Sequence, residues 1–547
     1  MQRSVSELSL KLGSAHFTSI VWTPSQLKEG EQGQFSEWLN CLNHSQFSTF
    51  LSSFFDNLSD ILMRLERNKV ILSTRPTEMQ TPDSLSITPT EADSFLKEFK
   101  EMIVSCCDFV ISRVTMILSL RPMELVCTTV WEFKTIYDIV DSFIQKFENL
   151  SNKTFYSIRS FLLTRAKNFV HKIHEHSISK LNVELEKETW VQVRVGWRYQ
   201  KLIDKSFIIL HSMHSIEDSS IQVSVDGYTA PMDLLEVLKH SRWDADVEED
   251  SKSLDSSETK SDVPLTFLEE LVVADETFMV PNCLLVLLDI IVPYVDLALL
   301  LEIVSAEAIL KLVQILNIYN SRTCQLILGA GAMHLAGLKS ITAKHLALSA
   351  HSLGAVISFI PSLRNALQEK LDSKHHGALK EFDRVSKDYS DHREEVFSKL
   401  VKIMVDIIEN SCTKTVKECN AKILKAKNPK TRVHLGSSDS ASALSLTPSD
   451  LMIRLLKQTK QLHKVLSIML PPRFRQDIFQ RISLSFAELI EKYFSQIDLT
   501  QSTPPVAEVD EVRQFLSVQA SYILNQLTSL KLSSETVYKA LNRWIVS

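Results

Sequence analysis

The clearest pattern along this chain is the recurrence of apolar residues at intervals of three and four positions, which is the spacing of one face of an α-helix. This spacing is strongest in four stretches, at residues 95–110, 136–150, 396–408 and 451–469. Between Pro122 and Gly196 the chain contains neither glycine nor proline. We therefore predict an all-α protein, with two or three long helices in that interval and a tight break near Ser151 and Asn152.

Alternation of apolar and polar residues, which is typical of β-strands, is confined to short segments. It occurs at residues 191–195, at residues 221–227 before an Asp-Gly pair, and at residues 271–280. In the last segment we expect Asp275 and Glu276 at the tip of a small hairpin. These segments predict one or two minor β-hairpins on a helical protein.

Composition strengthens the helical prediction. The chain has 11 glycines in 547 residues, far below the roughly 7% of average proteins. Because glycine supplies the positive φ angles of tight turns, so few glycines permit few hairpins. A hydrophobic content of 44% with 23% charged residues is enough for several packed cores.

Three polar stretches, at residues 73–90, 244–262 and 436–449, divide the chain. Two of them end with residues that are typical of a helix N-terminus. Thr88 is a candidate N-cap before Pro89, and Thr447 is a candidate N-cap before Pro448. We expect a short N-terminal helical segment (1–72), a linker (73–90), a middle domain of long helices (91–243), an acidic disordered linker (244–262), a C-terminal helical bundle (263–410), a basic and Ser-rich linker (411–449) and a terminal helical bundle (450–547).

Charge is unevenly distributed. The net charge of −6 argues against nucleic-acid binding as the main role. The acidic stretch at 244–262 has a net charge of −6, so the rest of the chain is balanced. A basic stretch with one acid has a net charge of +6, and its cations are Lys414, Lys417, Lys422, Lys425, Lys427, Lys430 and Arg432. These residues are the candidate contact with anionic lipid; the alternative is a solvated linker that extends a helix end.

Neither secretion nor a membrane span is predicted. The N-terminal residues lack a continuous apolar core, and the eight cysteines form no CxxC pair, which is typical of a reducing, cytoplasmic compartment. The one suspect span is at residues 277–304. Its longest uncharged run, residues 277–288, is shorter than the ~20 residues that a spanning helix needs. We expect a helix buried on most sides.

No motif in the sequence predicts catalysis, a cofactor or a metal ion. Gly329, Gly331 and Gly337 do not match the GxGxxG spacing of a dinucleotide loop, and a helical pattern precedes them instead of a strand. Such small residues favour close approach of two helices, or of a helix and a loop. His171 and His174 share a helix face but lack further ligands at metal spacing.

One region has a distinctive sequence, NSRTCQLILGAGAM followed by GLKSITAKHLALS, at residues 320–349. It closely resembles the signature region of the family of vacuolar protein sorting subunit fifty-four of the Golgi-associated retrograde protein (GARP) tethering complex. The resemblance continues at residues 166–175, 382–392, 399–404, 469–472 and 479–482, and it spans residues 125–500. The segment from Lys414 to Ser449 is longer than the usual connector of that family.

The resemblance implies an elongated stack of helical bundles of the tethering-complex type. It implies a noncatalytic role in retrograde transport from endosomes to the trans-Golgi network, with peripheral contact to both membranes. The implied partners are vacuolar protein sorting subunits fifty-one, fifty-two and fifty-three and trans-Golgi SNAREs. In that family the N-terminal half supplies assembly and SNARE contact. Residues 1–72 form no long heptad array, so we expect membrane engagement more than assembly from this chain.

Two alternatives remain open from the sequence. One is a helical scaffold of another tethering complex, the exocyst or an endosomal-recycling relative, which its co-purifying subunits would identify. The other is a nucleotide-binding enzyme that uses residues 329–337.

We expect no nucleotide binding. Neither NAD nor ATP should raise the thermal unfolding temperature of the purified protein, because the glycine spacing lacks a phosphate-binding turn. Differential scanning fluorimetry with each nucleotide checks this expectation, and a clear upward shift would revive the enzyme hypothesis.

Overall fold

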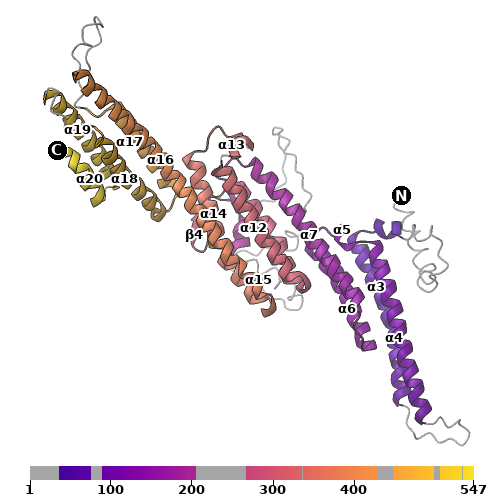
Figure 1. Ribbon diagram of the computed structural model, residues 1–547. Helices are drawn as coiled ribbons and strands as arrows, with labels where there is room; N and C mark the ends of the chain where they lie inside the picture. Colours follow the sequence, from indigo (N-terminus) through magenta and orange to yellow (C-terminus); the bar gives the residue numbers. More distant parts are fainter. Residues whose placement is uncertain are drawn as a thin grey trace, which may run out of the picture.

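The computed structural model describes residues 36–74, 89–204, 267–329, 331–335, 337–427, 447–497, 506–532 and 534–546. Figure 1 shows an elongated molecule, with the N-terminal helices at one end and the C-terminal helices at the other. The fold is mostly helical, which confirms the predicted class, and its two small antiparallel sheets are each two-stranded.

The helices follow one another along the long axis. They are α3 (His44–Thr74), α4 (Pro89–Leu120), α5 (Met123–Val126), α6 (Val130–Ser151), α7 (Tyr156–Lys187), α8 (Trp197–Asp204), α11 (Asn282–Leu300), α12 (Ser305–Ile327), α13 (Gly331–Leu335), α14 (Ala343–Lys370), α15 (His376–Leu379), α16 (Glu381–Lys427), α17 (Asp450–Met469), α18 (Pro472–Phe494), α19 (Val506–Ser529) and α20 (Glu535–Val546). The strands are β1 (Val195–Gly196), β2 (Phe267–Leu268), β3 (Leu271–Val273) and β4 (Glu276–Phe278).

The N-terminal end is a three-helix unit of α3, α4 and α6. Its core is aromatic, and the rings of Phe55 and Phe143 stack with centroids 4.1 Å apart. The buried Arg121, just after α4, donates to the carbonyl oxygens of Leu39 at 2.5 Å and Leu42 at 2.7 Å. The Leu39 carbonyl also accepts from the Leu42 N–H at 3.4 Å, so Arg121 adds a second donor at this helical turn.

The predicted break near Ser151 and Asn152 is confirmed. Helix α6 ends at Ser151, and Asn152 follows in the left-handed conformation with φ 50°. This conformation is a common way to end a helix, and asparagine tolerates it better than most residues.

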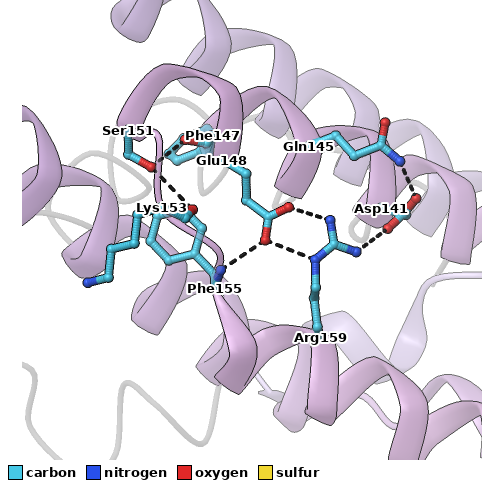
Figure 2. A network of polar contacts seen from close by, with 8 residues as sticks. All are labelled: Asp141, Gln145, Phe147, Glu148, Ser151, Lys153, Phe155 and Arg159. Carbon is cyan, nitrogen blue, oxygen red and sulfur yellow. Dashed lines mark hydrogen bonds and ion pairs between the residues drawn. The ribbon is translucent and has the colours of Figure 1, made fainter.

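A polar network holds the corner between α6 and α7 (Figure 2). The carboxylate of Glu148 accepts from the Phe155 backbone N–H and from Arg159 Nε, each at 2.9 Å, and it also bonds Arg159 Nη2. Arg159 Nη1 lies 3.2 Å from Asp141 Oδ1. The hydrogen bond from Arg159 lowers the pKa of Glu148. The corner is therefore fixed by a two-pronged guanidinium–carboxylate pair.

The predicted hairpin at residues 271–280 is present, with Leu271 opposite Phe278. Its tip differs from the prediction by one residue, because the turn consists of Ala274 and Asp275, with φ angles of 49° and 64°. Positive φ at both central residues is the geometry of a tight two-residue hairpin turn. Of the other strand predictions, only Val195 lies in a strand, and residues 221–227 lie outside the described residues.

Helix α11 is the buried helix that the sequence predicts at residues 277–304. Cys283 lies in the first turn of α11, and its backbone N–H donates to the Glu188 carboxylate at 2.7 Å. The backbone N–H of Trp190 donates to the same carboxylate at 2.9 Å. A carboxylate at a helix N-terminus satisfies free donors and complements the helix dipole. Pro293 lies inside α11 without ending it, and Asp289 accepts from Arg198 at 2.8 Å.

In the described part of the chain, three helical segments are long and apolar enough to cross a membrane, judged by length and composition. They are Leu96–Leu120, Asn282–Leu300 and Ala343–Lys370. The most apolar window of each is 33%, 67% and 78% buried within the protein, respectively.

Helix α16 runs through residues 410 and 411, where the sequence predicted a boundary between a bundle and a linker. No glycine or proline occurs from Glu381 to Lys427, so nothing in the local sequence stops the helix. The predicted acidic linker at 244–262 lies outside the described residues, as do residues 75–88 of the linker predicted at 73–90.

Helix α17 starts later than predicted. Its N-cap is Ser449, whose hydroxyl accepts from the Met452 N–H at 3.3 Å, and not Thr447. The Ser449 N–H also donates to Gln519 of α19 at 2.9 Å. A contact with a distant helix therefore fixes this start, and the local sequence alone did not reveal it.

Gly354 permits the closest packing between α14 and the β3–β4 hairpin. A Cβ atom at this position would lie 2.9 Å from Cε1 of Phe278. That distance is shorter than ordinary van der Waals contact, so only glycine fits without a shift of the hairpin.

We expect Gly354→Val to destabilise the protein by about 1–3 kcal/mol, because the added methyl groups overpack a filled site. Urea unfolding measures this change. Gly377→Ala is the matched control, since a Cβ there meets no atom within 4 Å and alanine favours helix. An equal loss of stability in both variants would contradict the packing argument.

Candidate functional site

The glycine cluster closes a helix end instead of forming a nucleotide loop. A Cβ on Gly329 would lie 2.7 Å from the Gln325 carbonyl oxygen, and one on Gly331 would lie 2.9 Å from the same atom. The chain therefore folds back tightly over the last turn of α12. The segment before the cluster is helix α12, whereas a dinucleotide loop follows a strand.

The histidines of α7 point in different directions. His174 is 5% exposed, and its Nδ1 lies 2.8 Å from the Tyr294 hydroxyl of α11. His171 is on the surface, with Nε2 3.1 Å from Glu175, and His176 is also exposed. Among the described residues, no group of three His, Cys, Asp or Glu side chains is placed to hold a metal ion.

The predicted basic stretch lies mostly on the last turns of α16. Lys414 and Lys417 are exposed on this helix, and the backbone at Lys422, Lys425 and Lys427 is helical too. Lys430 and Arg432 lie outside the described residues.

The same turns of α16 carry an apolar seam. Cys412, Val416, Cys419 and Ile423 are buried at intervals of three and four residues. This part of α16 belongs to the C-terminal bundle, where the helix packs against α17, α18 and α19. Lys414 and Lys417 are thus held on a packed helix rather than on a linker.

A second row of cations, on α17, was not predicted from the sequence. Arg454, Lys457, Lys460 and Lys464 are all exposed, and the only acid of this helix is Asp450 at its start. Ile468 is 68% exposed at the end of the row. The signal that could have found this row is the spacing of its cations, at intervals of three and four residues on one helix.

The two helices that carry these rows pack against each other and line an apolar groove of about 420 Å³. Its lining side chains include Ile403 and Ile407 of α16 and Leu462 and Val465 of α17. In Figure 1, α17 begins where α16 ends, so the two helices run in opposite directions.

The positions of the cations relative to this groove follow from helix geometry. Lys414 is seven residues after Ile407, or about 10 Å along the axis, and Arg454 is four residues before Gln458 of the groove wall. Because the helices are antiparallel, both cations lie beyond the same end of the groove. We call the exposed cations of these two neighbouring helices the basic face; they are Lys414, Lys417, Arg454, Lys457, Lys460 and Lys464.

His351 of α14 joins the hairpin to the end of α17. Its Nδ1 accepts from the Met279 N–H at 3.3 Å, so its Nε2 carries the proton and donates to the Met469 carbonyl oxygen. The ring is 7% exposed. Burial lowers the pKa of His351 from 6.5 to about 4, because the charged ring would lose solvation.

Comparison with known proteins identifies similar sequences. Residues 275–406 match the family model of Vps54-like proteins. The chain is 30% identical over 346 residues to the chloroplastic vacuolar protein sorting-associated protein 54 of Arabidopsis thaliana, a match that covers 56% of this chain and 33% of the relative. It is 26% identical over 430 residues to vacuolar protein sorting-associated protein 54 of Homo sapiens, covering 78% of this chain and 37% of the relative. The chain thus spans about a third of the length of these curated relatives.

The geometry of His351 predicts a loss of stability in acid. The folded state holds the neutral ring, whereas the unfolded chain binds a proton below pH 6.5, so stability is lost as pH falls from 6.5 toward 4. The variant His351→Gln keeps a neutral donor and acceptor at this position. Between pH 7 and pH 5, we expect its free energy of unfolding to fall by about 2 kcal/mol less than that of the parent protein. Urea unfolding at both pH values measures the difference, and equal losses would count against it.

Proposed function

We propose, because this chain belongs to the Vps54-like family, that it acts as a noncatalytic subunit of a GARP-type vesicle-tethering complex. The proposed role is retrograde transport from endosomes to the trans-Golgi network. Its support is the match to the family model at residues 275–406 and the similarity to named relatives over 78% of the chain. The elongated stack of helices suits a protein that bridges distances rather than one that encloses a substrate.

The proposal includes partners and location. Sister subunits fifty-one, fifty-two and fifty-three and trans-Golgi SNAREs are the proposed partners, and the protein is proposed to be peripheral on trans-Golgi and endosomal membranes. The chain covers 37% of the human relative, so these whole-protein properties are inferred through the family alone. The comparisons favour this assembly over the exocyst or an endosomal-recycling complex, because the named relatives are vacuolar protein sorting-associated protein 54 in each case.

Within this role, we assign contact with the carrier membrane to the basic face. The observation that carries this assignment is the presence of six exposed cations on two helices that pack against each other, α16 and α17. A cation near an anionic bilayer contributes about 1 kcal/mol. The exposed Ile468 adds an apolar side chain at the edge of the same surface, which suits shallow contact with the headgroup region.

The rigidity of the basic face matters for this function. Four of its cations lie on α17, which is fixed at its start by Gln519 and at its end by His351. The backbone that carries these cations is already ordered before docking, so less ordering entropy opposes binding than for a flexible basic tail.

We expect the purified protein to bind vesicles with 30% phosphatidylserine and to lose most of that binding when Lys414, Lys417, Arg454 and Lys457 are changed to Glu. Vesicle flotation measures it, and binding should weaken with added salt. The matched control changes Lys100, Lys146, Lys187 and Lys370 to Glu, because these exposed lysines lie elsewhere and alter net charge equally.

Two outcomes would count against parts of this proposal. Equal vesicle binding by both variants would remove the basic face from the membrane contact without touching the tethering role. Co-purification with exocyst subunits, and not with subunits fifty-one to fifty-three, would overturn the assignment to a GARP-type complex.

A further inference from the structure

A second groove lies on the other half of α16, between this helix and α12. Its volume is about 550 Å³. It ends at Glu395, which is 19 residues before Lys414, or about 28 Å along the helix. Both of its walls lie within the segment that matches the family model. The groove is therefore separate from the basic face, and binding at the groove does not depend on membrane binding.

The α16 wall of this groove is acidic. Glu381, Asp388, Asp391 and Glu395 line it. Their spacing of seven, ten and fourteen residues places them within an arc of about 80° and along about 21 Å of the helix. All four are exposed, and the described structure gives none of them an ion pair. Arg384 is the only cation among the lining residues that the structure describes.

The α12 wall is polar but uncharged. Asn317, Asn320, Ser321 and Gln325 line it with amide and hydroxyl groups. Cys324 lies among them, and its pKa is raised by burial and by the negative charge of Glu395. The field of the acidic wall therefore reaches across the groove to the neutral wall.

His392 is a buried acceptor in this groove. Its ring is 5% exposed, and its Nδ1 lies 2.7 Å from Oδ1 of Asn320. Because an amide oxygen only accepts, Nδ1 carries the proton and Nε2 is left with a lone pair. Nε2 is buried and has no hydrogen-bond partner in the described structure. A buried acceptor without a donor costs free energy, so a ligand that donates to Nε2 would be stabilised.

We propose that this groove binds a lysine- or arginine-bearing segment of a partner protein. Four carboxylates attract several cations spread over a length of peptide, and Nε2 of His392 accepts a hydrogen bond from one of them. The amides of the opposite wall suit peptide N–H and C=O groups, and the C=O acceptor is absent from inorganic cations and polyamines. The groove is thus a protein-recognition surface, opposite in charge to the basic face on the same helix.

The test uses the full chain and a fluorescein-labelled 16-residue peptide, with arginine at every third or fourth position in an alanine and glutamine background. Fluorescence anisotropy measures binding. We expect Asp388→Asn with Asp391→Asn to weaken binding about tenfold, which corresponds to about 1.4 kcal/mol. The matched control is Asp406→Asn with Glu418→Gln, which removes the same charge from exposed sites of α16 outside the groove.

Any of three other results would contradict the proposal. Equal weakening by the two double variants would show that net charge alone attracts the peptide. Unchanged binding by the groove variant would place the peptide elsewhere. Displacement of the peptide by spermine at equal molar concentration would identify a polyamine site instead, because the neutral wall would then add nothing to recognition.

Discussion

The structure depends on one constraint, the continuity of α16. Its 47 residues contain neither glycine nor proline, and at 1.5 Å per residue it is about 70 Å long. It packs against α12 and α14 and also against α17, α18 and α19. Because one rigid helix belongs to both bundles, the C-terminal bundle cannot turn freely relative to the one before it. The relative positions of the basic face and the acidic groove follow from this shared helix.

Buried polar side chains fix the joints that apolar packing leaves undetermined. Arg121 bonds the carbonyls that end the first helical turn, Glu188 caps α11, and His351 joins the hairpin to α17. Each bonds backbone groups at the end of a helix or strand, where the regular hydrogen-bond pattern stops. Hydrophobic burial holds the helices together without preferring one register, whereas these hydrogen bonds select a single arrangement. That is consistent with a protein whose proposed role requires defined distances between its surfaces.

The two surfaces of α16 have opposite charge. The acidic groove lies in the first four turns, and the basic face starts about 28 Å further along. On a rigid helix this separation is fixed, so a membrane bound at one site and a partner segment bound at the other would be held at a set distance. A flexible linker between them would instead let the distance vary with its length.

Local patterns in the chain were enough to predict the helices and several of their ends, whereas the surfaces depend on how distant helices pack. Apolar spacing predicted the long helices, and the break at Ser151 and the hairpin at 271–280 also followed from neighbouring residues. By contrast, a predicted linker became the end of α16 because other helices bury its apolar seam. The cations of α17 joined the basic face because that helix runs antiparallel to α16, and Asn320 meets His392 across 72 residues of sequence. Periodicity reports the preference of one helix, whereas a groove or a charged face requires the complementarity of whole helix surfaces, which no local pattern contains.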